Sequence, residues 1–227
     1  MKLLAVETST EACSAALHID GEVAERFEIA PREHTKLILP MIDALMADAE
    51  LRPQQLDALA FSRGPGSFTG VRISTGVIQG IAFGADLPVV PVSTLAALAQ
   101  NYFKTVDSDC AYTAMDARMG EIFWAVYQKN AKGIAELVGN EAVTAAQNII
   151  IPEQQGRGIG SAWGVYQQTL SDCLGTLLLG FEAEHLPRAS AIAELGVWGV
   201  ANNRAVNVEK AMPVYLRDKV AKKESER

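Results

Sequence analysis

The chain has 227 residues, of which 49% are apolar, and its formal net charge at pH 7 is −7. This length is enough for one large domain or two small ones, and the apolar content excludes a disordered chain. The acidic balance argues against a protein that binds nucleic acid on its own, because phosphate contacts need clustered Lys and Arg.

Three strands are predicted in the first thirty residues. Residues 2–6 (KLLAV) form an apolar run that ends at Glu7. This run is too short for the apolar segment of a signal peptide. Residues 12–19 and 22–29 flank Asp20-Gly21. An Asp-Gly pair between two strand-like runs is the strongest short-range signal for a hairpin.

A helix is predicted over about 33–49, followed by a strand at 57–62. Pro40 lies inside this helix, and an interior proline costs about 3 kcal/mol, so packing must compensate for it. Apolar residues recur in pairs every four positions and draw one stripe along the helix: Leu37, Ile38, Met41, Ile42, Leu45 and Met46.

The stretch GPGSFTGVR, from Gly64 to Arg72, precedes a second predicted helix at about 69–84. Three interpretations of this loop stand. As a phosphate cradle, it would bring backbone N–H groups to an anion, although it lacks the lysine of a P-loop. As a structural turn, Gly64 and Gly66 would take positive φ while Ser67 or Thr69 caps the helix. As an interface element, it would position the helix against a partner.

Three glycines of the second helix, at 76, 80 and 84, share one face. Each costs about 1 kcal/mol relative to alanine, which indicates close backbone approach at this face. The approaching element would be a partner helix, or this protein's own sheet or first helix. A strand at 88–92 follows, and Ser93 is predicted to cap a third helix that ends near Phe103.

The second half repeats this order after a polar boundary at 104–110. Each half begins with a buried strand that ends in an acid, Glu7 or Asp116, and continues with two strands split by a Gly turn. The order βββα, twice, is informative for the fold. Strands are predicted at 111–116, 121–127 and 134–138, and a loop with a short strand at 152–160.

A last helix is predicted at 189–202, with Ile192, Leu195 and Val200 facing inward. The tail at 219–227 is charged and expected to fray. Cysteines 13, 110 and 173 lie far apart, which indicates neither a zinc site nor a disulfide framework. No run reaches the roughly 18 uninterrupted apolar residues of a membrane span, so a soluble cytoplasmic protein is expected.

Several stretches together resemble the bacterial TsaB (YeaZ) family of tRNA threonylcarbamoyladenosine biosynthesis subunits. They are AVETSTEACSAAL, PREHTKLILPMI, AFSRGPGSFTGVRISTGVIQGIA, VPVSTLAALAQ, DARMGEIFWAVY and PVYLR. The resemblance implies an α/β fold of the duplicated actin-like/sugar kinase/Hsp70 ATPase type. We expect subdomains at 1–105 and 106–227, with a reduced second half and the helix near 189–202 packing back on the first subdomain.

The resemblance also implies a function. TsaD, the catalytic relative, transfers a threonylcarbamoyl group to N6 of adenosine 37 in tRNAs that read codons beginning with A. TsaB is its non-catalytic partner and acts with the ATPase TsaE. The expected partners are therefore TsaD, TsaE through the TsaD complex, and a second copy of the chain when TsaD is absent. Contact with tRNA is expected to be indirect.

No metal site is expected. In TsaD-like relatives two histidines lie four apart on a helix, and Thr94 and Leu98 stand at those positions here. The only histidines are His18, His34 and His185, and His34 is interpreted as a packing or capping residue rather than a base.

The resemblance makes the acids at the ends of the two first strands candidate groups of a residual nucleotide site, with ATP or ADP bound weakly. The alternative is that Glu7 satisfies hydroxyls and N–H groups of the ETST turn. The candidate nucleotide or phosphate loop comprises Glu7, Thr8, Ser9, Thr10, Gly64, Gly66, Ser67, Thr69 and Asp116.

A helix-bundle contact with TsaD, or with a second copy, is expected on the first two helices. Its predicted residues are Leu37, Ile38, Met41, Ile42, Leu45, Arg72, Gly76, Gly80 and Gly84. The rival functions are an active small-molecule kinase or ATPase, a metalloprotease, and a tRNA-binding module that acts alone. The short second half argues against a kinase or ATPase. The missing HExxH motif argues against a metalloprotease, and the acidic net charge argues against a tRNA-binding module that acts alone.

Overall fold

The computed structural model describes residues 1–217, so the prediction for the tail at 219–227 lies outside the described residues. A five-stranded sheet in the order β3-β2-β1-β4-β5 forms the first half. Its strands are β1 (Lys2–Glu7), β2 (Ala12–Ile19), β3 (Glu22–Ile29), β4 (Ala58–Ser62) and β5 (Val89–Val92). Asp20 and Gly21 have φ values of 49° and 106°, which confirms the predicted Asp-Gly hairpin.

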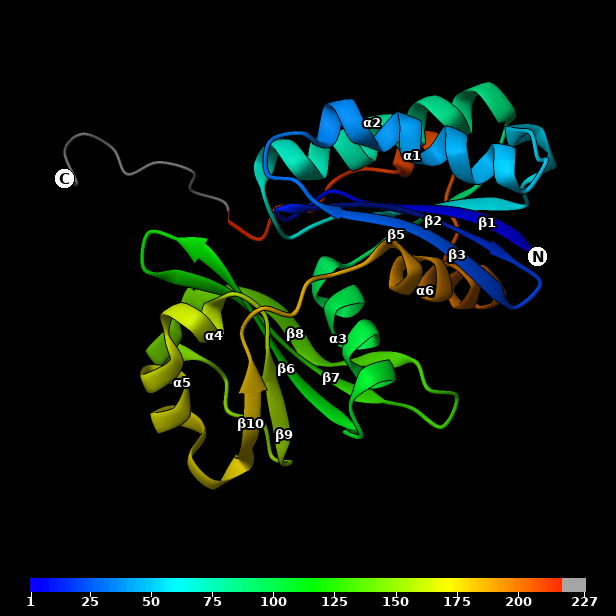
Figure 1. The fold of residues 1–227 in the computed structure, drawn as a ribbon. Helices are drawn as coiled ribbons and strands as arrows, with labels where there is room; N and C mark the ends of the chain where they lie inside the picture. Colours follow the sequence, from blue (N-terminus) through cyan, green and yellow to red (C-terminus); the bar gives the residue numbers. More distant parts are fainter. Residues whose placement is uncertain (218–227) are drawn as a thin grey trace.

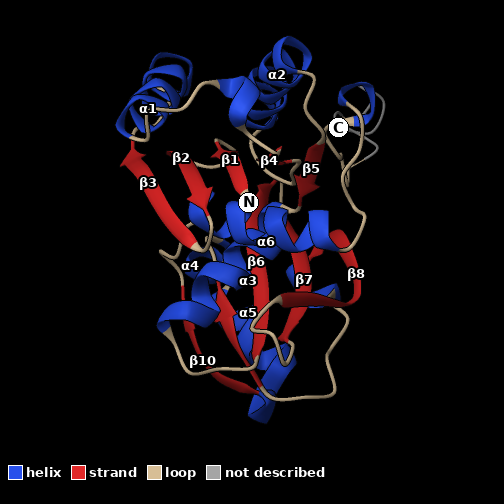
Figure 2. Cartoon of the chain, turned by 90° about the vertical axis from the view of Figure 1, so that its right-hand side faces the viewer, coloured by secondary structure: helices blue, strands red, loops and turns tan. Residues whose placement is uncertain are grey.

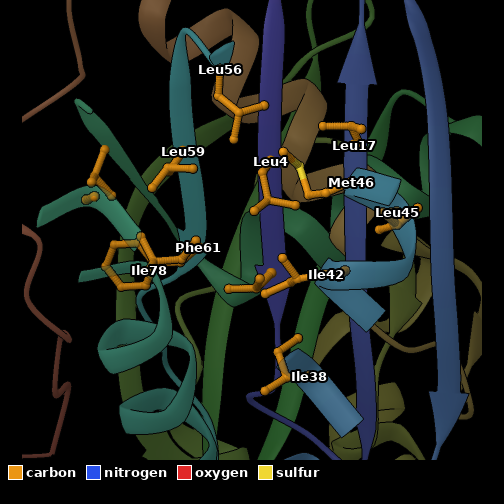
Figure 3. Packing of buried hydrophobic residues seen from close by; sticks show 14 of the residues in the cluster. Leu4, Leu17, Ile38, Ile42, Leu45, Met46, Leu56, Leu59, Phe61 and Ile78 are labelled. Atoms are coloured by element: carbon orange, nitrogen blue, oxygen red, sulfur yellow. The ribbon is translucent and has the colours of Figure 1, made fainter. Parts of the chain in front are cut away.

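Two helices cover one face of this sheet, α1 (His34–Asp48) and α2 (Phe68–Ala85) (Figure 1). Figure 2 shows the two helices side by side above the strands. Helix α1 continues through Pro40. Packing compensates for that proline, because Ile38, Ile42 and Leu45 enter a core with Leu4 and other sheet residues (Figure 3).

The second sheet has the order β10-β9-β6-β7-β8. Its strands are β6 (Cys110–Arg118), β7 (Glu121–Lys129), β8 (Ala135–Ala145), β9 (Gly156–Ile159) and β10 (Leu178–Glu182). In both sheets an antiparallel three-strand meander is extended by parallel strands on the side of its first strand. The duplicated actin-like α/β fold predicted from the sequence is therefore confirmed.

The third helix of each half packs on the sheet of the other half. Helix α3 (Thr94–Thr105) places Leu95 and Leu98 against the second sheet, in a core with Met115 and Ile159. Helix α6 (Ala189–Ala201) packs on the first sheet, where the added Cβ of an alanine at Gly196 would lie only 2.8 Å from Ala60 Cβ. Figure 1 shows both helices between the two sheets.

The sequence analysis predicted too few helices and strands in the second half. Helices α4 (Ala162–Val165) and α5 (Gln167–Leu174) and strand β10 were not predicted, and β8 is longer than 134–138. The position that corresponds to α1 holds only a short turn at 146–148. Helix α6, the helix expected near 189–202, packs on the first sheet, and Val206 just after it pairs with Val89 of β5. Across residues 1–217, no helix combines the length and the apolar character of a membrane span.

Candidate functional site: the cleft between the two halves

A cleft of about 1450 Å³ lies where the ends of the two duplicated sheets meet. Its walls are the loop after β1, the start of α2, the turn between β6 and β7, the start of α4 and the segment at 214–217. Of the predicted nucleotide-loop residues, six line this cleft: Ser9, Thr10, Gly66, Ser67, Thr69 and Asp116. Glu7, Thr8 and Gly64 are buried behind its surface.

The two loops of the first half are packed directly on each other. A Cβ atom at Gly66 would lie 2.5 Å from the Ser9 carbonyl oxygen, and one at Gly70 only 2.0 Å from the Thr8 carbonyl oxygen. The Ser67 N–H donates to the Ser9 carbonyl at 2.8 Å, and the Thr8 hydroxyl donates to the Gly70 carbonyl at 2.7 Å. Glycine is required at 66 and 70 because two backbones meet there.

The start of α2 has the cap that the sequence predicted. Ser67 Oγ accepts a hydrogen bond from the Gly70 N–H at 3.4 Å, whereas Thr69 is exposed. Gly64 has a φ of 100°, as predicted. Gly66 does not have a positive φ, so the prediction for that residue was wrong, and close approach to Ser9 explains the glycine instead.

Glu7 is fully buried and does not reach the cleft. Its Oε1 accepts a hydrogen bond from the Ser9 N–H, and its Oε2 has no hydrogen-bond partner among the described residues. Burial raises the pKa of Glu7 from 4.5 to about 7, because an ionised carboxylate is poorly solvated there. Glu7 therefore contacts the ETST turn, as the second of its two predicted roles requires.

Asp116 lies at the equivalent place in the second half and does line the cleft. Its carboxylate accepts from the Arg118 N–H at 2.8 Å and contacts Arg118 Nη1 at 3.1 Å. The backbone N–H of Asp116 donates to Ser161 Oγ at 3.0 Å. The two acids are thus not equivalent in the structure, since Glu7 is buried beneath its loop, whereas Asp116 lines the cleft and is paired with Arg118.

The predicted partner residues fall into two groups. Ile38, Ile42 and Leu45 are buried in the chain's own core, so they cannot contact a partner without leaving it. The prediction that these three residues of α1 contact a partner was therefore wrong. Leu37 and Met41 are partly exposed, and both also pack at the edge of that core. Gly76, Gly80 and Gly84 have no atom of the described chain within 4 Å of an added Cβ. The protein's own sheet and first helix therefore do not approach this glycine face.

The positions at which the resemblance places metal-binding histidines lie inside the fold. Thr94 and Leu98 are both fully buried in α3. His34 Nε2 lies 2.9 Å from the Thr10 carbonyl oxygen and 3.1 Å from that of Ala12, so the ring ties α1 to the loop after β1. Among residues 1–217, no group of three or more His, Cys, Asp or Glu side chains is arranged to hold a metal ion.

Sequence reasoning missed the part that residues 211–217 play at the cleft. This segment runs along α2, where Gln79 donates to the Ala211 carbonyl at 2.8 Å. Tyr215 then accepts a hydrogen bond from Arg72 Nε at 3.0 Å, and the Arg72 guanidinium lies 3.6 Å from the centre of the Phe68 ring. Arg217 contacts Glu121 of β7 at 2.5 Å. The PVYLR motif contributes to the resemblance, but its spacing does not predict these contacts.

A buried polar cluster joins the two halves behind the cleft. Glu141 of β8, whose side chain is 8% exposed, accepts hydrogen bonds from Ser93 and, at 2.6 Å, from Tyr127. Arg63, at the end of β4, contacts Glu141 at 3.4 Å. Burial is the main cause that raises the pKa of Tyr127, and the adjacent Glu141 adds to it. Each half therefore contributes one partner of a charge pair.

The cleft is lined by Glu11, His34 and Asp116, which do not form a metal-binding group within the described residues. What it does offer is exposed arginines, exposed aromatic rings and the N-terminal end of α2. Such groups bind anions and planar rings.

Comparison with known proteins gives consistent matches over most of the chain. The family model for TsaD, tRNA N6-adenosine threonylcarbamoyltransferase, matches residues 27–225. The tRNA threonylcarbamoyladenosine biosynthesis protein TsaB of Escherichia coli K12 is 41% identical over 97% of this chain and 96% of its own length. TsaB of Haemophilus influenzae is 40% identical over 97% and 95%. The structure of YeaZ from Pseudomonas aeruginosa superposes with a TM-score of 0.87 at 38% identity, covering 95% of this chain and 99% of that one.

Proposed function

The chain belongs to the TsaB (YeaZ) family, and on that premise we propose that it is a non-catalytic subunit of a cytoplasmic tRNA-modifying complex. In this proposal it binds and organises TsaD, together with TsaE, for transfer of a threonylcarbamoyl group to N6 of adenosine 37. The tRNAs concerned read codons that begin with A. The chain itself performs no step of the transfer.

The burial of Thr94 and Leu98 is the observation that carries the proposal. In TsaD-like relatives the histidines that bind a metal stand at these positions. Here both side chains are fully buried, Leu98 lies in the core that α3 forms with the second sheet, and leucine has no atom that can coordinate an ion. The buried Glu7 supports the same conclusion, because it is engaged with its own loop.

The test is threonylcarbamoyl transfer to unmodified tRNA from the threonylcarbamoyl-adenylate intermediate, measured with this chain alone, TsaD alone and both together. We expect no transfer by this chain alone and a large increase when it is added to TsaD and TsaE. Robust transfer by the isolated chain would overturn the proposal, and so would full activity of TsaD and TsaE without it.

We propose the glycine face of α2 as the surface that meets TsaD, or a second copy of the chain in its absence. Gly76, Gly80 and Gly84 are exposed with open space around them, and Phe83 on the same face is 82% exposed. Leu39 of the neighbouring α1 is 55% exposed. An apolar ring beside a strip of small residues allows a partner helix to approach closely.

Gly80→Leu tests this surface, with Ala201→Leu as the control. Ala201 is the exposed last residue of α6, which packs on the opposite face of the sheet. Because an added Cβ at Gly80 meets nothing within 4 Å, the variant should stay folded by circular dichroism. We expect it to lose TsaD binding and self-association in analytical ultracentrifugation, and Ala201→Leu to retain both. Unchanged TsaD affinity in the folded Gly80→Leu protein would exclude this face.

We further propose that this function needs no cofactor in the chain itself. The Ser67 N–H at the start of α2 already donates to the Ser9 carbonyl, and Glu7 is buried away from the cleft. Binding of ATP or ADP is expected to be weak, and phosphate release is expected to be absent. Calorimetric titration and a phosphate-release assay test this, and turnover of ATP by the isolated chain would favour the alternative of a kinase or ATPase.

A further inference from the structure

We propose that the cleft between the two halves binds a single-stranded loop of RNA, with arginines on its phosphates and aromatic rings on its bases. This inference rests on the proposed function for the identity of the RNA, which is the tRNA to be modified. It revises the expectation that contact with tRNA is only indirect, and it stands on three features of the cleft.

The first feature is the charge of the cleft. Its lining contains four arginines, Arg32, Arg72, Arg118 and Arg217, against two carboxylates, Glu11 and Asp116. The whole chain, in contrast, has a formal net charge of −7. Arginines therefore outnumber carboxylates along this cleft although the molecule as a whole is acidic, and two of the four, Arg118 and Arg217, are paired with Asp116 and Glu121. An excess of arginine at a hollow is the electrostatic pattern of a phosphate-binding surface.

The second feature is the kind of cation and its accessibility. All four are arginines, whose planar guanidinium groups bind phosphate oxygens in pairs and stack on bases. The Arg118 side chain is 86% exposed although it contacts Asp116, and Arg32 and Arg72 are exposed. In the described residues, no carboxylate is paired with Arg32 or Arg72.

The third feature is a stacking surface. Phe68 and Tyr215 are 52% and 46% exposed, and their ring centres are 5.8 Å apart with an angle of 36° between the rings. The Arg72 guanidinium lies on Phe68 and holds Tyr215 through its hydroxyl. The rings are thus fixed in place while much of their surface stays open to the cleft. Unpaired bases stack on such rings without regard to sequence.

The size of the cleft favours a segment of single-stranded RNA over a single phosphate as its ligand. A volume of about 1450 Å³ exceeds the roughly 300–1,000 Å³ of small-molecule pockets. The arginines come from the loop before α1, from α2, from the β6–β7 turn and from the C-terminal segment, so they border the cleft from several sides. A duplex would present its bases paired and stacked, whereas a loop exposes them.

The experiment titrates a fluorescently labelled RNA hairpin with an anticodon-sized loop onto the isolated chain, in salt from about 50 mM to about 200 mM. Wild type should bind, with affinity that falls as salt rises. Arg32→Gln should weaken binding several-fold and reduce the slope of log K against log salt by about 0.7, the value for one lost phosphate contact with a single strand. Arg52→Gln, an exposed arginine outside the cleft, is the matched control and should match wild type.

Phe68→Ala separates stacking from charge. It should weaken binding roughly tenfold and leave the salt slope unchanged, because a ring and not a phosphate contact is lost. A fully base-paired hairpin stem without a loop should compete poorly. The proposal is overturned if wild type does not bind the hairpin at about 50 mM salt, or if Arg32→Gln and Arg52→Gln weaken binding equally.

Three further outcomes distinguish this inference from a protein-binding cleft and from the proposed function. If the cleft variants bind RNA normally but lose affinity for TsaD, the cleft receives a protein segment and the RNA proposal is wrong. If the hairpin fails to bind while threonylcarbamoyl transfer still requires the chain, only this inference fails. If the hairpin binds as described but transfer proceeds without the chain, the proposed function fails and the RNA site stands.

Discussion

A pair of glycine substitutions in α2 tests the packing on which the candidate site is built. Gly70 and Gly80 belong to the same helix, but their surroundings are opposite. An added Cβ at Gly70 would lie 2.0 Å from the Thr8 carbonyl oxygen, whereas at Gly80 it would meet nothing within 4 Å. We predict that Gly70→Ala destabilises the protein and that Gly80→Ala stabilises it.

The magnitudes follow from these distances. Ordinary contact begins at 3.4 Å, so the loop after β1 or the start of α2 must move by about 1.4 Å to admit the methyl group that Gly70→Ala adds. Overpacking of this kind costs about 1–3 kcal/mol, and the movement also strains the 2.7 Å hydrogen bond from Thr8 to the Gly70 carbonyl. Gly80→Ala gains up to about 1 kcal/mol from helix propensity.

Thermal unfolding followed by circular dichroism measures the difference. For a chain of this size 1 kcal/mol corresponds to about 2–4 °C, so the two variants should melt roughly 2 to 16 °C apart. Repeating the melts at two protein concentrations separates an effect on the chain from one on self-association. If Gly70→Ala melts at or above the temperature of Gly80→Ala, the close contact between the two loops is wrong.

Three other predictions concern charge and metal. The raised pKa of Glu7 means that the folded protein holds its proton more tightly than the unfolded chain. The stabilisation of the folded state by this bound proton is therefore fully present below pH 4.5 and is lost as pH rises through about 7. Glu7→Gln should remove that loss. Between pH 5 and pH 8 the free energy of unfolding of the variant, measured in urea, should rise by up to about 3 kcal/mol relative to that of wild type. A difference between the two proteins that does not change with pH would contradict the raised pKa of Glu7. Glu141→Ala should cost about 3–5 kcal/mol because it leaves Arg63 partly buried and unpaired, whereas Asp48→Ala, which breaks the exposed pair with Arg26, should cost no more than about 1 kcal/mol in the same urea titration. Elemental analysis of tag-free protein should find no stoichiometric zinc or iron, and a full equivalent of either would contradict the absence of ligands.

The first half could be predicted closely because its signals are local. The Asp20-Gly21 turn, the apolar stripe of α1 and the Ser93 cap are each specified by residues a few positions apart. Strand β10 and helices α4 and α5 carry weaker local signals. Their positions are set by packing around Trp163 and Leu170, which share a core with strands that are distant in the sequence.

The candidate site was predictable in part for the same reason. The cap at Ser67 follows from local chemistry. That a Cβ at Gly70 would strike the Thr8 carbonyl does not, because the two residues are brought together only by the pairing of β1 with β4. The stripe on α1 shows the converse limit. Periodicity identified Ile38, Ile42 and Leu45 as one face, but it could not say whether that face meets this chain or another.

The exchange of third helices between the halves has a consequence for synthesis on the ribosome. Helix α6 covers the face of the first sheet formed by Leu3, Ala5 and Ala60, yet it is encoded some hundred residues after β5. The nascent chain therefore carries an uncovered apolar surface through most of its translation. The first half becomes complete only after residue 201 has left the exit tunnel, so the two halves must finish folding together rather than in succession.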